Sequence, residues 1–195
     1  MENAQRNERS SPQIDVSLGS FSRIVLTGFM GAGKTTVGQL LAQTMGWTFL
    51  DVDQHIERSA GASAQDLFAT RGETAFRNLE TDALAFALEQ SDTIIALGGA
   101  AIDAVANRLL LANSVGSRIV FLDAPFATLI DRCLIQERSS RAPYRPLLHQ
   151  TELAHARYLV RRSLYLDCAS FVVAVAERTA QEVAFLIGDT MGVLR

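Results

Sequence analysis

The residues best suited to chemistry form one glycine-rich segment, Gly28-Phe29-Met30-Gly31-Ala32-Gly33-Lys34-Thr35-Thr36. Its order matches G-x-x-x-x-G-K-[ST], the phosphate-binding P-loop pattern. The glycines let consecutive backbone N–H groups turn toward phosphate oxygens, Lys34 would reach the β- and γ-phosphates, and the Thr35 hydroxyl would ligate Mg²⁺. The pattern therefore predicts a nucleotide site made of Gly31, Ala32, Gly33, Lys34, Thr35 and Thr36.

The neighbouring elements suit such a loop. Residues 23–26, Arg-Ile-Val-Leu, are typical of a buried strand, and apolar residues after the loop recur at helical spacing. A helix that begins at the loop places its N-terminus against the phosphates, where its backbone N–H groups and dipole favour an anion.

Further β-rich runs alternate with helical patterns along the chain. We expect the later strands at residues 47–50, 93–97, 118–122 and 170–175. Residues 74–89 have the apolar spacing of a helix, and Ser63 followed by Asp66 is typical of a helix start. Strand–helix alternation with nearly continuous apolar strands predicts an α/β fold: a five-stranded parallel sheet with helices on both faces.

Ligands of such sheets bind beyond the carboxyl ends of the strands, so those ends carry the remaining candidates. The second strand ends in Asp51-Val52-Asp53 and the third in Gly98-Gly99-Ala100. Two carboxylates near a P-loop could serve Mg²⁺ through water and the hydroxyl of a phosphate acceptor. One of them could instead cap the helix that begins near Gln54.

Bulk properties exclude several classes of function. With 195 residues, 48% hydrophobic, and a net charge of −3, the chain suits one globular domain without the basic field of a nucleic-acid binder. No apolar run is long enough to cross a membrane. Cys133 and Cys168 lack metal or redox spacing, which favours thiols in a reducing cytoplasm. We expect a disordered polar tail over residues 1–20 and a single domain over 21–195.

Beyond the P-loop, several segments together resemble the shikimate kinases. They are residues 50–57 (LDVDQHIE), 72–80 (GETAFRNLE), 96–99 (ALGG), 145–148 (RPLL) and 164–165 (LY), in that order and spacing. The resemblance covers about residues 23–175. It implies a P-loop kinase fold and a cytoplasmic, monomeric enzyme that phosphorylates the 3-hydroxyl of shikimate with ATP and Mg²⁺, on the route to chorismate and the aromatic amino acids.

The resemblance also implies roles for individual residues. It assigns substrate binding to Asp53, Arg77, Gly98, Gly99 and Arg161. It assigns catalysis to Lys34, Asp53 and Arg145, with Arg145 also touching the nucleotide, and metal binding to Thr35 and, through water, Asp51. In this scheme Asp53 holds the acceptor hydroxyls and can act as base, while arginine forks grip the substrate carboxylate.

A mobile lid is expected over about residues 136–150. The stretch from Gln136 to Arg145 is polar, basic and without helical periodicity. Its closure would bring Arg145 over the phosphates and exclude water that could otherwise accept the phosphoryl group.

Each of these arginines has an alternative role. Arg77 stands four residues after Glu73, so a surface ion pair on a helix would also account for it. Arg145 could be a solvated loop charge. A shift of one residue would exchange Arg161 for Arg162.

Two departures from the family pattern bear on activity. Ala100 stands where the family has a third loop glycine. The alanine is harmful only if the backbone at this position needs a positive φ. Ser163 replaces a proline before Leu164-Tyr165. Two other functions stay open: a kinase for gluconate or a nucleoside monophosphate, and a P-loop module that binds ATP without transferring phosphate.

Overall fold

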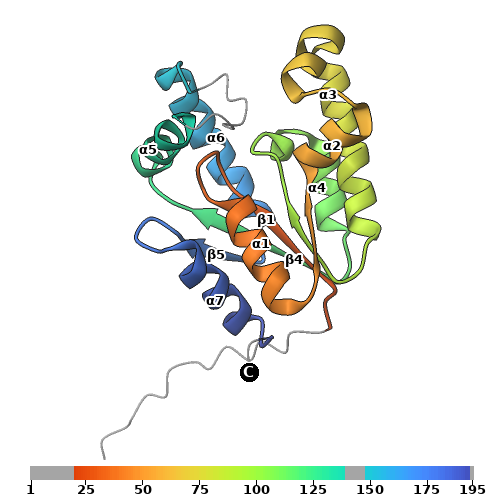
Figure 1. Ribbon diagram of the computed structural model, residues 1–195, viewed down its shortest axis with the longest axis vertical. Coiled ribbons are helices and arrows are strands. Elements are labelled where there is room, and N and C mark those ends of the chain that lie inside the picture. Colours follow the sequence, from red (N-terminus) through yellow and green to blue (C-terminus); the bar gives the residue numbers. More distant parts are fainter. Residues whose placement is uncertain (1–19, 139–147, 194–195) are drawn as a thin grey trace, which may run out of the picture.

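A five-stranded parallel sheet forms the centre of the protein, in a computed structural model that describes residues 20–138 and 148–193 (Figure 1). The strands are β1 (Arg23–Thr27), β2 (Thr48–Asp51), β3 (Thr93–Ala96), β4 (Ser117–Asp123) and β5 (Phe171–Ala174). Their order across the sheet is β2-β3-β1-β4-β5, and all neighbouring pairs are parallel. The predicted α/β fold and all five predicted strands are confirmed, with ends that differ by a residue.

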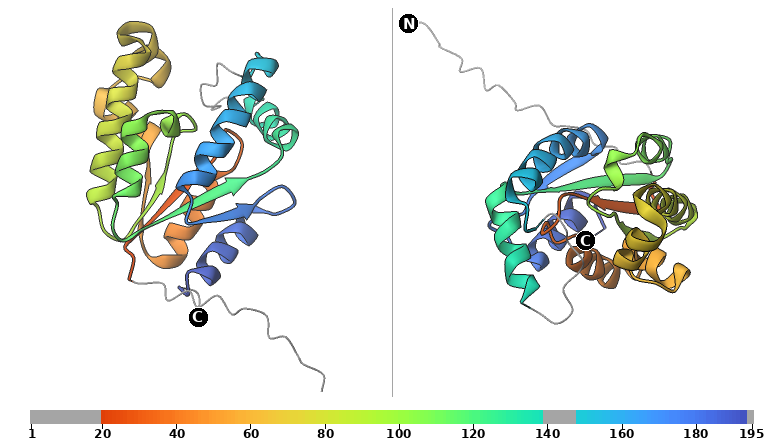
Figure 2. Two further views of the ribbon diagram at one scale, coloured as in Figure 1. Left: turned by 180° about the vertical axis from the view of Figure 1, so that it is seen from behind. Right: turned by 90° about the horizontal axis from the view of Figure 1, so that it is seen from above.

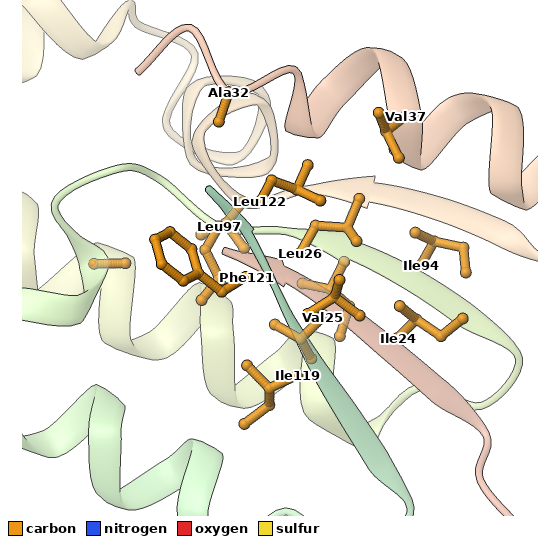
Figure 3. Packing of buried hydrophobic residues seen from close by; sticks show 14 of the residues in the cluster. Ile24, Val25, Leu26, Ala32, Val37, Ile94, Leu97, Ile119, Phe121 and Leu122 are labelled. Carbon is orange, nitrogen blue, oxygen red and sulfur yellow. The ribbon is translucent and has the colours of Figure 1, made fainter. Parts of the chain in front are cut away.

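The first strand lies in the middle of the sheet and of the core. Val25 on β1 is in register with Ile95 on β3 and with Ile119 on β4. Both faces of β1 are covered, so Ile24, Val25 and Leu26 are all fully buried and the strand shows no alternation of polar and apolar residues. Figure 3 shows the side chains of β1 and β4 packed together with those of the flanking elements. The P-loop is therefore anchored to the central strand of the sheet, which is buried on both faces.

Helices cover both faces of the sheet (Figure 2). They are α1 (Lys34–Met45), α2 (Val52–Ala60), α3 (Ala64–Glu89), α4 (Val105–Ala112), α5 (Phe126–Glu137), α6 (Thr151–Cys168) and α7 (Ala180–Thr190), with a short 3₁₀ helix η1 (Ala101–Asp103). α1 and α7 pack together on one face, while α3, α4 and α6 pack in a row on the other. In the described residues no helix is both long and apolar enough to cross a bilayer.

Helix α3 is longer than the sequence pattern predicts, because it joins two helical segments at Gly72. Ser63 caps its start and accepts a hydrogen bond from the Asp66 N–H, as predicted. Gly72 has φ 79° and ψ 169°, a non-helical conformation that bends the helix before the segment carrying Arg77. A glycine can take this conformation without a steric penalty, so the helix continues in a new direction.

The first residues of the predicted lid belong to a helix instead. Gln136 and Glu137 form the end of α5 and Arg138 is its C-cap, because an exposed last turn is held by backbone hydrogen bonds and needs no apolar periodicity. His149 lies 2.9 Å from Glu137, an ion pair that brings the two ends of this region together when the histidine is protonated. Arg145, like residues 1–19 of the predicted tail, lies outside the described residues.

We expect Gly72→Ala to lower the free energy of unfolding by about 1–3 kcal/mol, because a Cβ strains the backbone at φ 79°, ψ 169°. Gly61→Ala is the matched control. Gly61 also has open space around it, but its φ of 63° and ψ of 23° fall in the left-handed region, where alanine costs about 1–2 kcal/mol. Urea unfolding should show the larger loss for Gly72→Ala. Equal losses would mean that the backbone conformation of Gly72 excludes a side chain no more strongly than the left-handed conformation of Gly61 does.

Candidate active site

The P-loop runs from the end of β1 to the start of α1 with glycines at its tightest points. Gly28, Gly31 and Gly33 have φ values of 143°, 79° and 91°. A Cβ on Gly28 would stand 2.7 Å from the Leu122 carbonyl oxygen, and one on Gly31 would collide with the carbonyl of Leu129 on α5. Gly33 is the N-cap of α1 and offers no side-chain cap, so the first N–H groups of the helix point at a place where an anion can bind.

Lys34 and Thr35 begin α1 and point to different partners. The Lys34 ammonium group donates to the carbonyls of Gly28 at 2.8 Å and Phe29 at 3.1 Å, so it lies across the loop. The Thr35 hydroxyl donates to the Asp51 carboxylate at 2.8 Å. Of the other predicted nucleotide residues, Ala32 is buried against the core and Thr36 is exposed on the first turn of α1.

Asp51 has two roles at the end of β2. It is the N-cap of α2, with one carboxylate oxygen accepting from the Gln54 N–H at 3.2 Å, and its other oxygen accepts from Thr35. The capping alternative therefore holds for Asp51 but does not exhaust its contacts. Asp53, in the first turn of α2, is the second carboxylate of this pair and does not cap the helix.

Asp53 meets a second carboxylate, Glu80 of α3, beside Gly98. A Cβ on Gly98 would lie 2.6 Å from Asp53 Oδ1 and 2.7 Å from Glu80 Oε1, so both oxygens occupy the space that a side chain would need. The Glu80 side chain is only 1% exposed. Sequence reasoning gave Glu80 no role; its position one helical turn after Arg77, on the apolar side of α3, was the available signal.

Arg77 balances this acidic pair. Its guanidinium group donates to Glu80 at 2.9 Å and to Glu73 at 3.3 Å, and lies 5.6 Å and 5.7 Å from the ring centroids of Phe68 and Phe76. The surface ion pair with Glu73 exists, but the shorter and buried contact is with Glu80. Arg77 is thus held at the edge of the acidic cluster rather than in solvent.

The electrostatics of the cluster leave Asp53 able to exchange a proton near neutral pH. Burial, with smaller contributions from the charges of Glu80 and Asp51, raises the pKa of Asp53 from 3.8 to about 7, and Lys34 and Arg77 only partly oppose this. Burial also raises the pKa of Glu80 against the attraction of Arg77. A carboxyl group with such a pKa can accept a proton from a bound hydroxyl.

Neighbouring arginines of α6 pair with different carboxylates, one on η1 and one at the end of β4. Arg161 donates from Nε and Nη2 to Asp103 at 3.0 and 2.7 Å, and its guanidinium carbon lies 5.9 Å from the Phe29 ring centroid. Arg162 makes the same kind of pair with Asp123, the last residue of β4, at 3.1 and 2.6 Å. Of the two, Arg161 is near enough to Glu80 for its charge to lower the pKa of that acid.

The glycine loop after β3 tolerates its alanine. Ala100 has φ −101° and ψ −7°, in the right-handed region, where a Cβ causes no strain. Gly99 lies against the P-loop: a Cβ placed on Gly99 would stand 3.6 Å from the backbone nitrogen of Met30. The Gly99 carbonyl accepts a hydrogen bond from the Tyr165 hydroxyl at 2.5 Å. Ser163 lies within α6 and donates to the Val160 carbonyl, so the missing proline leaves the helix intact.

The comparisons with known proteins agree with one another. The family model described as "Shikimate kinase" matches residues 30–191. The shikimate kinase of Thermobifida fusca is 40% identical over 169 residues, 86% of this chain and 93% of the relative, and that of Streptomyces coelicolor is 39% identical, covering 82% and 90%. A solved structure, shikimate kinase from Acinetobacter baumannii in complex with shikimate, superposes with a TM-score of 0.77 at 30% identity, covering 90% of this chain and 96% of the other.

We expect Asp53→Asn to stabilise the nucleotide-free, metal-free protein. The folded-state pKa of Asp53, about 7, lies above its ordinary value of 3.8, so ionised Asp53 opposes folding fully above pH 7 and not at all below about pH 3.8. The gain in unfolding free energy should be about 2–4 kcal/mol at pH 8 and about half of that at pH 5.5.

Urea unfolding at the two pH values measures this gain. Asp82→Asn removes an exposed carboxylate of α3 and is the control, for which no change beyond about 0.5 kcal/mol is expected at either pH. A loss of stability in Asp53→Asn at pH 8 would contradict the electrostatic account of the cluster.

Proposed function

The chain belongs to the shikimate kinase family, and from that premise we propose which of its residues carry out the reaction. The enzyme transfers the γ-phosphoryl group of ATP to the 3-hydroxyl of shikimate, giving shikimate 3-phosphate and ADP, in the pathway to chorismate and the aromatic amino acids. One observation supports the assignment of roles most strongly: the P-loop and the Asp53–Glu80–Arg77 cluster lie at the same edge of the sheet, joined by Gly98 and Gly99.

The nucleotide half of the site consists of the P-loop and Asp51. Backbone N–H groups from Gly31 to Thr36 surround the phosphates of ATP, and Lys34 leaves the loop carbonyls to contact the β- and γ-phosphates. Thr35 and Asp51 supply a hydroxyl and a carboxylate, the hard oxygen donors that suit Mg²⁺, with Asp51 acting through water. Bound Mg²⁺ would neutralise part of the charge on the phosphates.

The acceptor half holds shikimate by its carboxylate and its hydroxyls. Arg77 and Arg161 present guanidinium forks to the carboxylate, and Gly98 and Gly99 line the bound ring. Asp53 accepts hydrogen bonds from the acceptor hydroxyl and takes up its proton as the phosphoryl group is transferred, which its pKa of about 7 permits. Arg145 stabilises the charge that develops on the phosphoryl oxygens.

We also infer that the enzyme is a cytoplasmic monomer that binds neither nucleic acid nor a membrane. The net charge of −3 and the two free cysteines, one of them buried, favour this inference. Residues 21–195 are inferred to be a single domain with a lid that includes Arg145.

ADP release from Mg·ATP tests the function directly. We expect release that requires shikimate, over many turnovers, with the product identified as the 3-phosphate. Gluconate and a no-acceptor reaction are the controls. Preferential phosphorylation of gluconate would identify gluconate, and not shikimate, as the acceptor. If folded protein binds ATP but releases no ADP in response to an acceptor, the result would favour a P-loop module that binds ATP without transferring phosphate.

Gly98→Ala should abolish most activity while ATP binding survives. The new Cβ would stand within 2.7 Å of both Asp53 and Glu80, so one carboxylate must move, and we expect kcat/KM for shikimate to fall about 100-fold or more. Ala100→Gly is the matched control at the same loop, and its activity should stay within about twofold because Ala100 is unstrained. Full activity in Gly98→Ala would mean that the two carboxylates need not hold their positions.

A further inference from the structure

Asp103, at the end of η1, forms a two-point ion pair with Arg161 across 58 residues of chain. We propose that Asp103 is a positioning residue: it fixes the guanidinium group of Arg161 so that its remaining N–H groups meet the carboxylate of shikimate. The proposal rests on the proposed function, because it takes Arg161 as a ligand of that carboxylate.

The ion pair uses one edge of the guanidinium group and leaves another. Asp103 Oδ1 and Oδ2 accept from Nε and Nη2 of Arg161 at 3.0 and 2.7 Å. Nη1 forms no hydrogen bond with any residue that the structure describes. A guanidinium group has five N–H donors in a rigid plane, so the Nη1 side can form a second two-point contact while the Nε side stays bound to Asp103.

The orientation of Arg161 is restricted from further directions. The Arg161 side chain is only 10% exposed, and its guanidinium carbon lies over the Phe29 ring, 5.9 Å from the ring centroid. A buried guanidinium group without an anionic partner would be strongly destabilised, so some carboxylate must accompany it before the substrate arrives. Asp103 is that partner.

Asp103 itself is held firmly. Its N–H donates to the Ala100 carbonyl at 2.9 Å, and its own carbonyl accepts from Arg108 of α4 at 2.9 Å. Buried Asn107, also on α4, donates to the Ala101 carbonyl at 2.9 Å. The turn that carries Asp103 is therefore pinned to α4, and it transmits that rigidity to Arg161.

The pair also lies at the acceptor end of the site. The charges of both Asp103 and Arg161 act on buried Glu80, which contacts Arg77 at 2.9 Å and borders the same Gly98 as Asp53. A carboxylate bound between Arg77 and Arg161 would thus meet two guanidinium groups, each held from behind by an acidic residue of the protein.

Loss of the Asp103 charge has two opposing effects. It removes a negative charge that repels the substrate carboxylate, and it frees Arg161 to rotate or to seek Glu80. We expect the loss of orientation to dominate. A misplaced Arg161 loses its two-point contact with the substrate carboxylate. The repulsion between Asp103 and that carboxylate is smaller, because the positive guanidinium group of Arg161 lies between them.

The test is Asp103→Asn, measured by steady-state kinetics with both substrates. We expect KM for shikimate to rise about tenfold, with kcat and KM for ATP within about twofold of the unchanged enzyme. Asp123→Asn is the matched control: it breaks the same two-point pair on the adjacent arginine, Arg162, and should leave KM for shikimate unchanged.

A second substrate and a second variant separate the possible failures. Shikimate carboxamide lacks the charge that Arg161 recognises, so Asp103→Asn should change its kcat/KM far less than that of shikimate; equal losses would reveal general damage and overturn the proposal. If Arg161→Lys leaves KM for shikimate unchanged, Arg161 does not bind the substrate carboxylate, and the role that the proposed function gives to Arg161 is wrong. If Arg161→Lys raises KM while Asp103→Asn lowers it or leaves it unchanged, the inference about Asp103 alone is wrong.

Discussion

Compensation of charge at the carboxyl edge of the sheet is the constraint on which the rest of the site depends. Four acidic residues gather there with three basic ones: Asp51, Asp53, Glu80 and Asp103 with Lys34, Arg77 and Arg161. Removed from water, unpaired charges of this kind would cost several kcal/mol each, so every guanidinium group has a carboxylate partner. Asp53 forms no ion pair within the described part of the chain, and its burial raises its pKa to about 7, an effect that the charges of Lys34 and Arg77 only partly oppose. Asp53, whose pKa lies near neutral, is the acid to which the proposed reaction assigns a proton.

Close approach of backbone segments makes this concentration of charge possible. Gly98 leaves room for two carboxylates beside β3, and Gly31 lets the P-loop pack directly on α5. Tyr165, fully buried on α6, reaches across to the Gly99 carbonyl and fixes the loop that lies on the P-loop. The nucleotide and acceptor halves thus meet at this loop; a side chain at Gly98 would displace the carboxylates of the acceptor half, and one at Gly31 would push the P-loop away from α5.

The two halves are built in different ways. The phosphate-binding half is local: β1, the loop and α1 follow one another, and the loop conformation depends on glycines within a few residues. The acceptor half is assembled from α2, α3, η1 and α6; its Arg77–Glu80 pair is local to α3, but its Arg161–Asp103 pair joins residues far apart in the chain. Rigid pairing from behind gives each arginine a defined direction before any ligand binds, which is the arrangement that lowers the cost of binding a small anion.

The sheet, the P-loop and the cap at Ser63 could all be predicted from the sequence, because each depends on the backbone preferences or periodicity of nearby residues. It also placed Asp51, Asp53 and Gly98 at strand ends, and the family pattern pointed to Arg77. The other features of the site depend on contacts that form when the chain folds. Glu80 as partner of Arg77 depends on which side of a bent α3 is buried, and the harmless φ of Ala100 depends on how η1 packs. The family pattern assigns substrate binding to Arg161 and leaves Arg162 as its alternative; successive side chains on a helix point about 100° apart, so each meets a different carboxylate. Partners such as Asp103 and Asp123 lie far from these arginines in the chain, so their pairing leaves no local trace in the sequence.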